Sequence, residues 1–183
     1  KSKGNVIDPW DIFGSLGADA LRWYFLSSGQ PWTPRRVYVD GIREATRQTL
    51  LTLWNCYSFF ATYADLDGWT PGAAPAAPAT HVLDRWILSE LDDTVATVTD
   101  ALEGFDAFGG AGRLATFVDD LSNWYVRRSR RRFWRGVSES DTDKQSAYST
   151  LYTALVTLSK LLAPFTPFVA EEIYQNLVRS LDA

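Results

Sequence analysis

Apolar residues recur at intervals of three and four along most of the chain, the spacing of an α-helix that buries one face. The clearest run spans roughly residues 36–63, and a shorter run covers residues 18–28 and ends at Gly29. The stripe of the longer run comprises Val39, Ile42, Thr46, Leu50, Leu53, Tyr57, Phe60 and Ala64. Residues 1–16 lack this period and contain two glycines and a proline, so we expect them to be irregular.

The second half of the chain carries four further helical runs. Their apolar positions extend over residues 83–102, 114–125, 148–162 and 173–181. Gly104 is expected to end the first of them, and Gly109, Gly110 and Gly112 are expected to punctuate the turn that follows. Thr166 and Pro167 are residue types that begin a helix, as N-cap and first helical residue. Because no stretch alternates with a period of two, we predict an all-α bundle with short connections.

One segment does not fit a helix. Residues 67–80 contain three prolines and two glycines, so we predict an exposed linker there. We divide the chain into an N-terminal connector, residues 1–35, and a helical bundle, residues 36–183, with this linker inside the bundle.

The composition narrows the class of protein. The chain has 183 residues, is 46% hydrophobic and contains 8 Trp, 8 Tyr and 10 Phe, enough for a substantial core. No apolar run is long enough for a membrane span, and no signal peptide opens the sequence. The lone Cys56 excludes an internal disulfide and indicates a reducing, cytoplasmic setting. With His81 as the one histidine, expected to be exposed in the linker, we expect no metal site. Since the chain has no methionine, it is expected to be a processed product or a piece of a larger protein.

Positive charge is concentrated on one helix, although the net charge is −4. Of the 18 basic residues 14 are Arg, and six of these lie between Arg127 and Arg135. At 100° per residue, one set continues the core-facing stripe of the preceding helix: Arg128, Arg132 and Arg135. We expect these to be structural arginines that pair with internal carboxylates, with Glu171 and Glu172 as candidates, or to extend beyond the bundle.

The other set lies on a different face of that helix. It comprises Arg127, Arg130, Arg131 and Trp134, at positions i, i+3, i+4 and i+7. Guanidinium groups around an aromatic ring suit phosphate contact combined with base stacking, so we predict that this set binds RNA. The alternative for each arginine is a solvated or salt-bridged surface residue.

The first residues form a small basic loop. Lys1, Ser2, Lys3 and Gly4 could close on a polyphosphate, although a frayed terminus has the same composition. Three longer blocks follow it, Gly17–Leu26, Asn123–Trp134 and Leu162–Tyr174. In this order and spacing, the four blocks resemble the region downstream of the catalytic core in class I aminoacyl-tRNA synthetases. The resemblance covers nearly the whole chain.

Within that family the block Asn123–Trp134 favours the isoleucyl branch, and the valyl and leucyl branches are the alternatives. The opening resembles the end of the Lys-Met-Ser-Lys-Ser signature, with Lys1 as its second lysine and Ser2 as its final serine. The resemblance implies that Lys1 meets the ATP phosphates in the transition state, with Ser2 in the same loop. Lys3 lies just outside the signature, and residues 8–28 would connect the loop to the bundle.

The resemblance also implies partners. In the intact enzyme, a separate catalytic domain uses ATP and Mg²⁺ to activate isoleucine and attach it to its tRNA, while the helical domain grips the anticodon stem and anticodon. This chain lacks the His-Ile-Gly-His-like signature of that catalytic domain. We therefore expect the chain to be inactive alone and to hold no cofactor itself. The expected partners are the isoleucine tRNA and the catalytic part of the same polypeptide, with no membrane and a monomeric state.

A non-catalytic helical module that binds a protein partner is the alternative of another class. Aromatic residues at helical spacing usually pack a core, so they do not by themselves indicate a ligand. A bundle enzyme would need inward carboxylates or histidines, such as Glu-x-x-His pairs, and the sequence has none.

Overall fold

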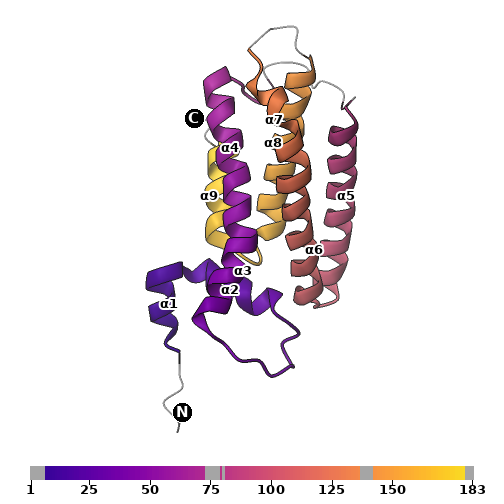
Figure 1. Cartoon of the computed structure of the whole chain (residues 1–183). Coiled ribbons are helices and arrows are strands. Elements are labelled where there is room, and N and C mark those ends of the chain that lie inside the picture. Colours follow the sequence, from indigo (N-terminus) through magenta and orange to yellow (C-terminus); the bar gives the residue numbers. More distant parts are fainter. Residues whose placement is uncertain (1–6, 73–78, 80, 137–141, 180–183) are drawn as a thin grey trace.

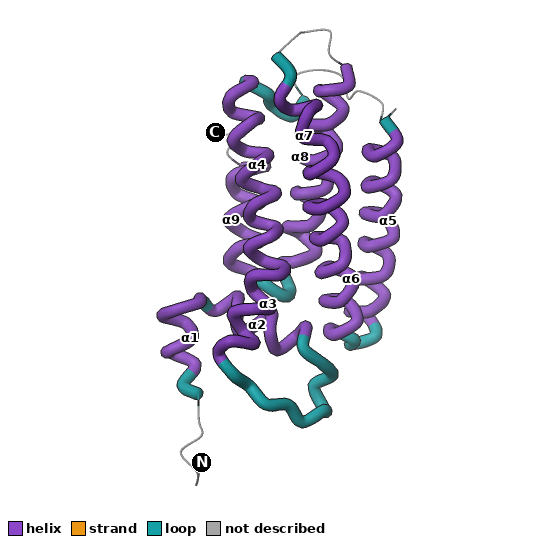
Figure 2. The backbone as a smooth tube through the Cα atoms, viewed as in Figure 1, coloured by secondary structure: helices purple, strands orange, loops and turns teal. Residues whose placement is uncertain are grey.

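The computed structural model describes residues 7–72, 79, 81–136 and 142–179, and within these ranges the chain is helical without strands (Figure 2). The helices are α1 Pro9–Leu16, α2 Ala18–Ser27, α3 Val39–Ala45, α4 Thr52–Asp67, α5 Val82–Glu103, α6 Ala107–Asp119, α7 Arg127–Trp134, α8 Thr142–Leu162 and α9 Pro167–Leu177. Two π-helical segments, η1 Thr46–Leu51 and η2 Asp120–Val126, join α3 to α4 and α6 to α7. The all-α prediction is confirmed.

The long helices lie side by side along one axis. Figure 1 shows α4, α5, α6, α8 and α9 packed beside one another in the bundle, with α1, α2 and α3 gathered at its lower end and α7 at its upper end. Fully buried residues from these helices, including Leu53, Ile87, Phe117 and Leu151, form one continuous core. Because α1, α2 and α3 lie at one end of the bundle and α7 lies at the other, the two ends present different surfaces.

The predicted helix over residues 36–63 is confirmed, with its start at Val39 and with η1 inside it. Hydrogen bonds in a π-helix join residues i and i+5, so each π turn holds more residues than an α turn. The predicted stripe nevertheless stays in the core on both sides of η1, since Ile42, Leu53 and Phe60 are all buried.

Residues 1–16 were predicted to be irregular, and this prediction is wrong from Pro9 onward. Asp8 is the N-cap of α1, and its Oδ1 accepts a hydrogen bond of 2.9 Å from the Trp10 backbone N–H. Pro9 occupies the first helical position, where its missing N–H costs nothing. Ile12 of α1 packs with Tyr24 and Ile42 in a small second core at the lower end of the bundle.

The glycines after α5 do not all lie in a turn. Gly104 caps α5 as predicted, but α6 begins at Ala107, so Gly109, Gly110 and Gly112 are helical. A Cβ on Gly110 would lie 3.4 Å from Cζ of Phe165. The helix α6 therefore packs closely against the turn between α8 and α9 at this position.

That turn is held by α2, at the other end of the sequence. Arg22 donates from Nε to the Phe165 carbonyl at 3.0 Å and from Nη2 to the Pro164 carbonyl at 2.8 Å. Thr166 and Pro167 begin α9 as predicted, but the Thr166 side chain does not cap the helix. Instead, Oδ2 of Asp19 accepts the Val169 N–H at 2.7 Å, so a residue of α2 caps α9.

Candidate nucleic-acid interface

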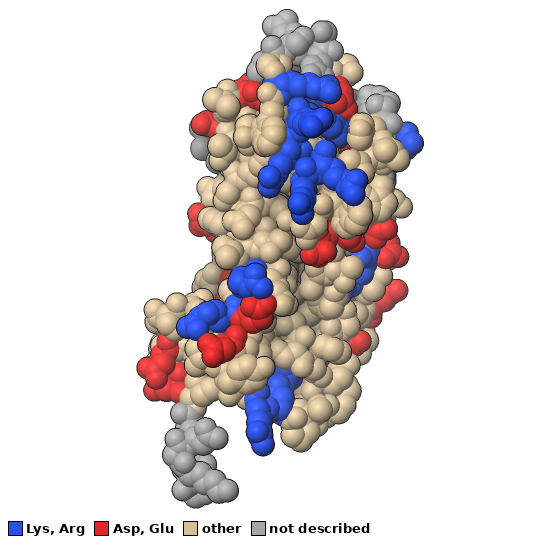
Figure 3. Space-filling view, in the orientation of Figure 1, with Lys and Arg blue, Asp and Glu red and all other residues tan. Residues whose placement is uncertain are grey.

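Four arginines form an exposed basic surface on α7: Arg127, Arg128, Arg130 and Arg131, which we call the arginine face. Figure 3 shows the basic cluster at the upper end of the bundle, on the side turned to the viewer. Trp124 and Trp134 lie beside it with 48% and 56% of their surface exposed. All four members of the predicted RNA-binding set are therefore exposed at one end of the bundle.

Among the residues that the structure describes, no carboxylate forms an ion pair with an arginine of this face. The ion pairs of the helix belong to Arg132 and Arg135 instead. A cluster of like charges without counter-charges repels itself, and an anionic ligand relieves that repulsion. The arginine face thus has the electrostatic character of an anion-binding surface.

The three arginines predicted to be structural do not share one environment. Arg132 is buried, but Arg128 and Arg135 are exposed. The buried residues at the end of η2 and in α7 are Tyr125, Val126, Ser129, Arg132 and Phe133. For Arg128 the reason is η2, because its wider turns rotate the residues that follow away from the stripe predicted at 100° per residue. Arg135 lies beyond the last residue of α7, where the chain is extended.

Arg132 makes the central interaction of a buried polar cluster. Its Nη1 and Nη2 donate to the two carboxylate oxygens of Asp84 at 2.6 and 2.8 Å. Tyr125 and Ser146 donate their hydroxyl groups to the same carboxylate at 2.8 and 2.7 Å. Asp143 receives a further ion pair from Arg132 at 2.8 Å. Glu171 and Glu172 are exposed and hydrogen bond to residues of their own helix, so they are not the predicted partners.

These contacts set the protonation of the cluster. Burial alone would raise the pKa of Asp84, but the hydrogen bonds from Arg132, Ser146 and Tyr125 outweigh burial and lower the pKa. Burial alone would lower the pKa of Arg132, but the hydrogen bonds to Asp84 outweigh burial and raise the pKa of Arg132. The pKa of Tyr125 is raised well above its ordinary value, chiefly by burial. At neutral pH the pair is therefore charged and the phenol is a neutral donor.

Sequence reasoning missed Asp84, although a signal was present. Asp84 lies three residues before Ile87 and seven before Leu91, on the buried stripe of α5. A carboxylate on such a stripe needs a buried cationic partner. An acidic residue in an apolar stripe and an arginine on another helix would have suggested the pair.

A second buried cation, Lys144, joins the start of α8 to the end of α4 through an ion pair. Nζ of Lys144 lies 2.5 Å from Oδ2 of Asp67, and Lys144 also donates to the Arg135 carbonyl at 2.6 Å. Tyr148 donates to the same Asp67 oxygen, and its ring stacks on Trp69 with centroids 5.5 Å apart. This second network fixes the end of α7 and leaves the outward side of that helix exposed.

Cys56 of α4 is a buried free cysteine near Ser122 and Arg130. Burial raises its pKa to about 11, while a hydrogen bond from Ser122 and the charge of Arg130 act in the opposite direction. At neutral pH the side chain is therefore a thiol, which packs as a small apolar group.

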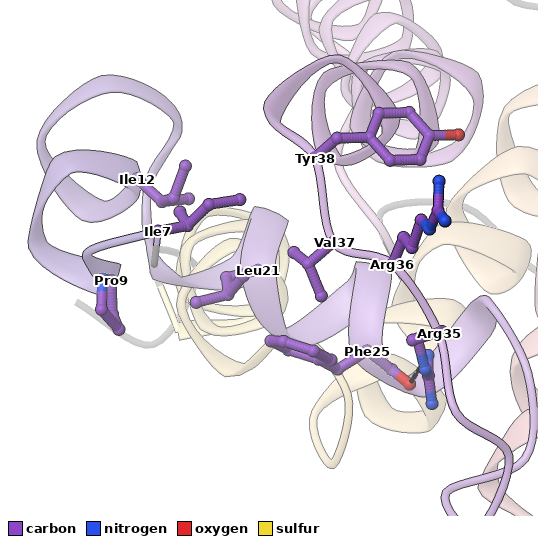
Figure 4. Close-up of a pocket in the computed structure, with 9 residues that line it drawn as sticks. All are labelled: Ile7, Pro9, Ile12, Leu21, Phe25, Arg35, Arg36, Val37 and Tyr38. Atoms are coloured by element: carbon purple, nitrogen blue, oxygen red, sulfur yellow. Dashed lines mark hydrogen bonds between the residues drawn. The ribbon is translucent and has the colours of Figure 1, made fainter. Parts of the chain in front are cut away.

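A hollow lies at the lower end of the bundle and is lined by residues of α1, α2 and the segment before α3 (Figure 4). It has a volume of about 820 Å³, with apolar walls that include Ile7, Leu21 and Phe25. Arg35 lies at its edge and donates to the carbonyls of Phe25 and Gly29 at 2.8 and 3.1 Å. Since these bonds hold Arg35 against its own loop, its guanidinium stabilises the connector rather than forming a free anion site.

The predicted loop residues Lys1, Ser2 and Lys3 lie outside the described residues. His81 was expected to be exposed in the linker, but it is half-buried and caps α5, its Nδ1 accepting the Leu83 N–H at 3.2 Å. Within the described ranges no group of three or more His, Cys, Asp or Glu side chains could hold a metal ion. None of the helices in those ranges is long and apolar enough to cross a membrane.

Comparison with known proteins gives two kinds of match. A family model described as the anticodon-binding domain of tRNA ligase matches residues 84–182. The isoleucine–tRNA ligase of Dehalococcoides mccartyi is 57% identical over 182 residues, which cover 100% of this chain and 18% of the relative. The isoleucine–tRNA ligases of Thermus thermophilus and Streptomyces avermitilis are 52% and 49% identical, over 99% and 97% of this chain and 17% and 16% of their own length. The chain thus spans less than a fifth of the length of these relatives.

Proposed function

Because the chain belongs to the family of anticodon-binding domains of tRNA ligases, we propose that its arginine face binds the anticodon arm of a tRNA. The observation that carries this proposal is the exposed cluster of Arg127, Arg128, Arg130 and Arg131 beside Trp124 and Trp134. Arginines bind phosphates, and aromatic rings stack with the unpaired bases of a loop. An anticodon arm supplies both groups within a few nucleotides.

We further propose that the tRNA is the isoleucine tRNA and that the chain acts within an isoleucine–tRNA ligase. Matches to isoleucine–tRNA ligases that cover nearly all of this chain support this choice over the valyl and leucyl alternatives. The whole ligase would use ATP and Mg²⁺ in a catalytic part that this chain does not contain, and would work in the cytoplasm. Lys1 would contact the ATP phosphates and Ser2 would complete the same loop.

The two ends of the bundle would then serve two partners. Residues 1–35 would form the connector to the catalytic part, and residues 36–183 would form the tRNA-binding bundle. The small separate core around Ile12 supports a connector at the lower end, because α7 lies at the opposite end (Figure 1). The remainder of the ligase and the anticodon arm would therefore not compete for one surface.

A salt titration tests the proposed function. Binding of the 183-residue chain to isoleucine tRNA should weaken steeply as salt rises, because the arginines displace counterions from phosphates. Stronger binding to this tRNA than to an unrelated tRNA would place part of the discrimination in this chain. Equal binding would make the chain a general clamp for tRNA stems, and absence of binding at low salt would contradict the proposal.

A further inference from the structure

The arginine face contains one feature that a phosphate clamp alone does not need. The guanidinium of Arg128 lies over the indole ring of Trp124, with its Cζ 4.4 Å from the ring centroid. This arrangement is a cation–π contact between residues one helical turn apart on an exposed surface. It holds the planar guanidinium against the ring instead of leaving it free to follow a phosphate.

A surface hollow of about 500 Å³ adjoins this pair, lined by Asn123, Trp124, Arg127 and Arg128. Its lining combines an aromatic ring, two cations and an amide. Nδ2 of Asn123 donates to Oδ1 of Asp119 at 2.7 Å, which orients the amide and leaves its oxygen as the acceptor of that side chain. The hollow therefore offers a stacking surface, positive charge and a hydrogen-bond acceptor within the six residues from Asn123 to Arg128.

We propose that this hollow is a subsite for a single unpaired nucleobase, which stacks on Arg128 and Trp124. The inference rests on the proposed function and assigns the stacking role within the arginine face to this pair. A guanidinium plane stacks on a base as an aromatic ring does, and its charge adds attraction. The indole beneath it orders the arginine in advance, so less side-chain freedom is lost on binding. Arg127 contacts the phosphate of the same nucleotide, and the Asn123 oxygen accepts from an N–H group of the base.

A lysine in place of Arg128 separates stacking from charge. The variant Arg128→Lys keeps the positive charge but removes the planar group. Two probes are needed, the anticodon-arm hairpin of isoleucine tRNA and a blunt RNA duplex with the same number of phosphates. The duplex presents phosphates without an unpaired base, so only the hairpin can fill the subsite.

The Arg128→Lys variant should bind the hairpin about tenfold more weakly than the unmodified chain and bind the duplex as before. Trp124→Leu should show the same selective loss, because it removes the ring that orders Arg128. Arg43→Lys, an equally conservative change at an exposed arginine paired with Asp40 on α3, should alter neither probe. A 2-aminopurine base in the hairpin loop should be quenched by the unmodified chain and less quenched by Arg128→Lys.

The outcomes separate the two proposals. Unchanged hairpin binding by Arg128→Lys would overturn the subsite and leave the proposed function intact. Equal weakening on hairpin and duplex would also overturn it, because Arg128 would then act only as a charge. If the unmodified chain binds neither RNA, the proposed function fails and the subsite fails with it.

Discussion

Asp84 of α5 accepts hydrogen bonds from both terminal nitrogens of Arg132 of α7, at 2.6 and 2.8 Å, inside the bundle. The paired nitrogens and oxygens of such a bidentate contact align in one plane, so the contact has one preferred geometry. It therefore fixes how far α7 is rotated about its axis. Since the arginine face lies on the outer side of the same helix, this buried pair orients the surface arginines.

Replacing Asp84 tests how strongly the bundle depends on this pair. Asp84→Asn leaves the buried Arg132 charge without its main counter-charge, so the free energy of unfolding should fall by about 3 kcal/mol. Denaturant unfolding at neutral pH measures this change. Asp93→Asn is the matched control, because the Asp93 side chain is 68% exposed in its ion pair with Arg113, and its removal should cost less than about 1 kcal/mol.

The double variant Asp84→Leu with Arg132→Met removes both charges together. It should lose less stability than Asp84→Asn, because no charge is then left unpaired in the core. A loss of less than about 1 kcal/mol in Asp84→Asn would show that Asp143 and solvent satisfy Arg132 without Asp84.

The same carboxylate should make stability depend on pH. The pKa of Asp84 is lowered in the folded chain, while an unfolded aspartate has a pKa of about 3.9. The ionised carboxylate therefore stabilises the fold above about pH 3.9, and this contribution is lost as the pH falls toward the folded pKa. The difference in unfolding free energy between the unmodified chain and Asp84→Asn should be constant from pH 7 to about 5 and shrink below about pH 4. A difference that stays constant down to about pH 2.5 would contradict this assignment.

Removing three surface arginines tests the arginine face as a whole. The triple change of Arg127, Arg130 and Arg131 to Ala should weaken tRNA binding and flatten its logarithmic salt slope by about two to three. Helicity, read by circular dichroism, should be unchanged because all three side chains are exposed. If the variant binds tRNA normally but melts much earlier, the three arginines are structural and the proposed interface is wrong.

Gly110 and Gly112 of α6 test how closely the two sides of this helix are packed. A Cβ on Gly112 would meet nothing within 4 Å, whereas one on Gly110 would lie 3.4 Å from Phe165 and 3.7 Å from Cβ of Ala101. Gly112→Ala should raise the free energy of unfolding by about 1 kcal/mol, because alanine favours the helix. Gly110→Val should lower it by about 1–3 kcal/mol through overpacking. Thermal unfolding of both variants measures the contrast, and similar effects at the two positions would contradict the observed packing of α6.

The sequence pattern predicted most helices because a helix that buries one face has apolar residues at regular, short intervals. The runs around Ile87, Leu114 and Leu151 all repeat at three and four residues, and each becomes a helix of the bundle. Where the local pattern was weak, the prediction failed. The start of α1 depends on a cap from Asp8, and the glycines of α6 are helical because neighbouring helices stabilise them.

The sequence by itself determined that the chain is helical, that its positive charge concentrates on one helix and that its blocks resemble a tRNA-ligase family. Only the tertiary structure decided which arginines are buried. A periodic pattern assumes a constant number of residues per turn, and the π-helical segment η2 changes that number just before Arg127. The pairing of Arg132 with Asp84, 48 residues away in sequence, depends on how α5 and α7 pack, and that packing is a property of the whole core.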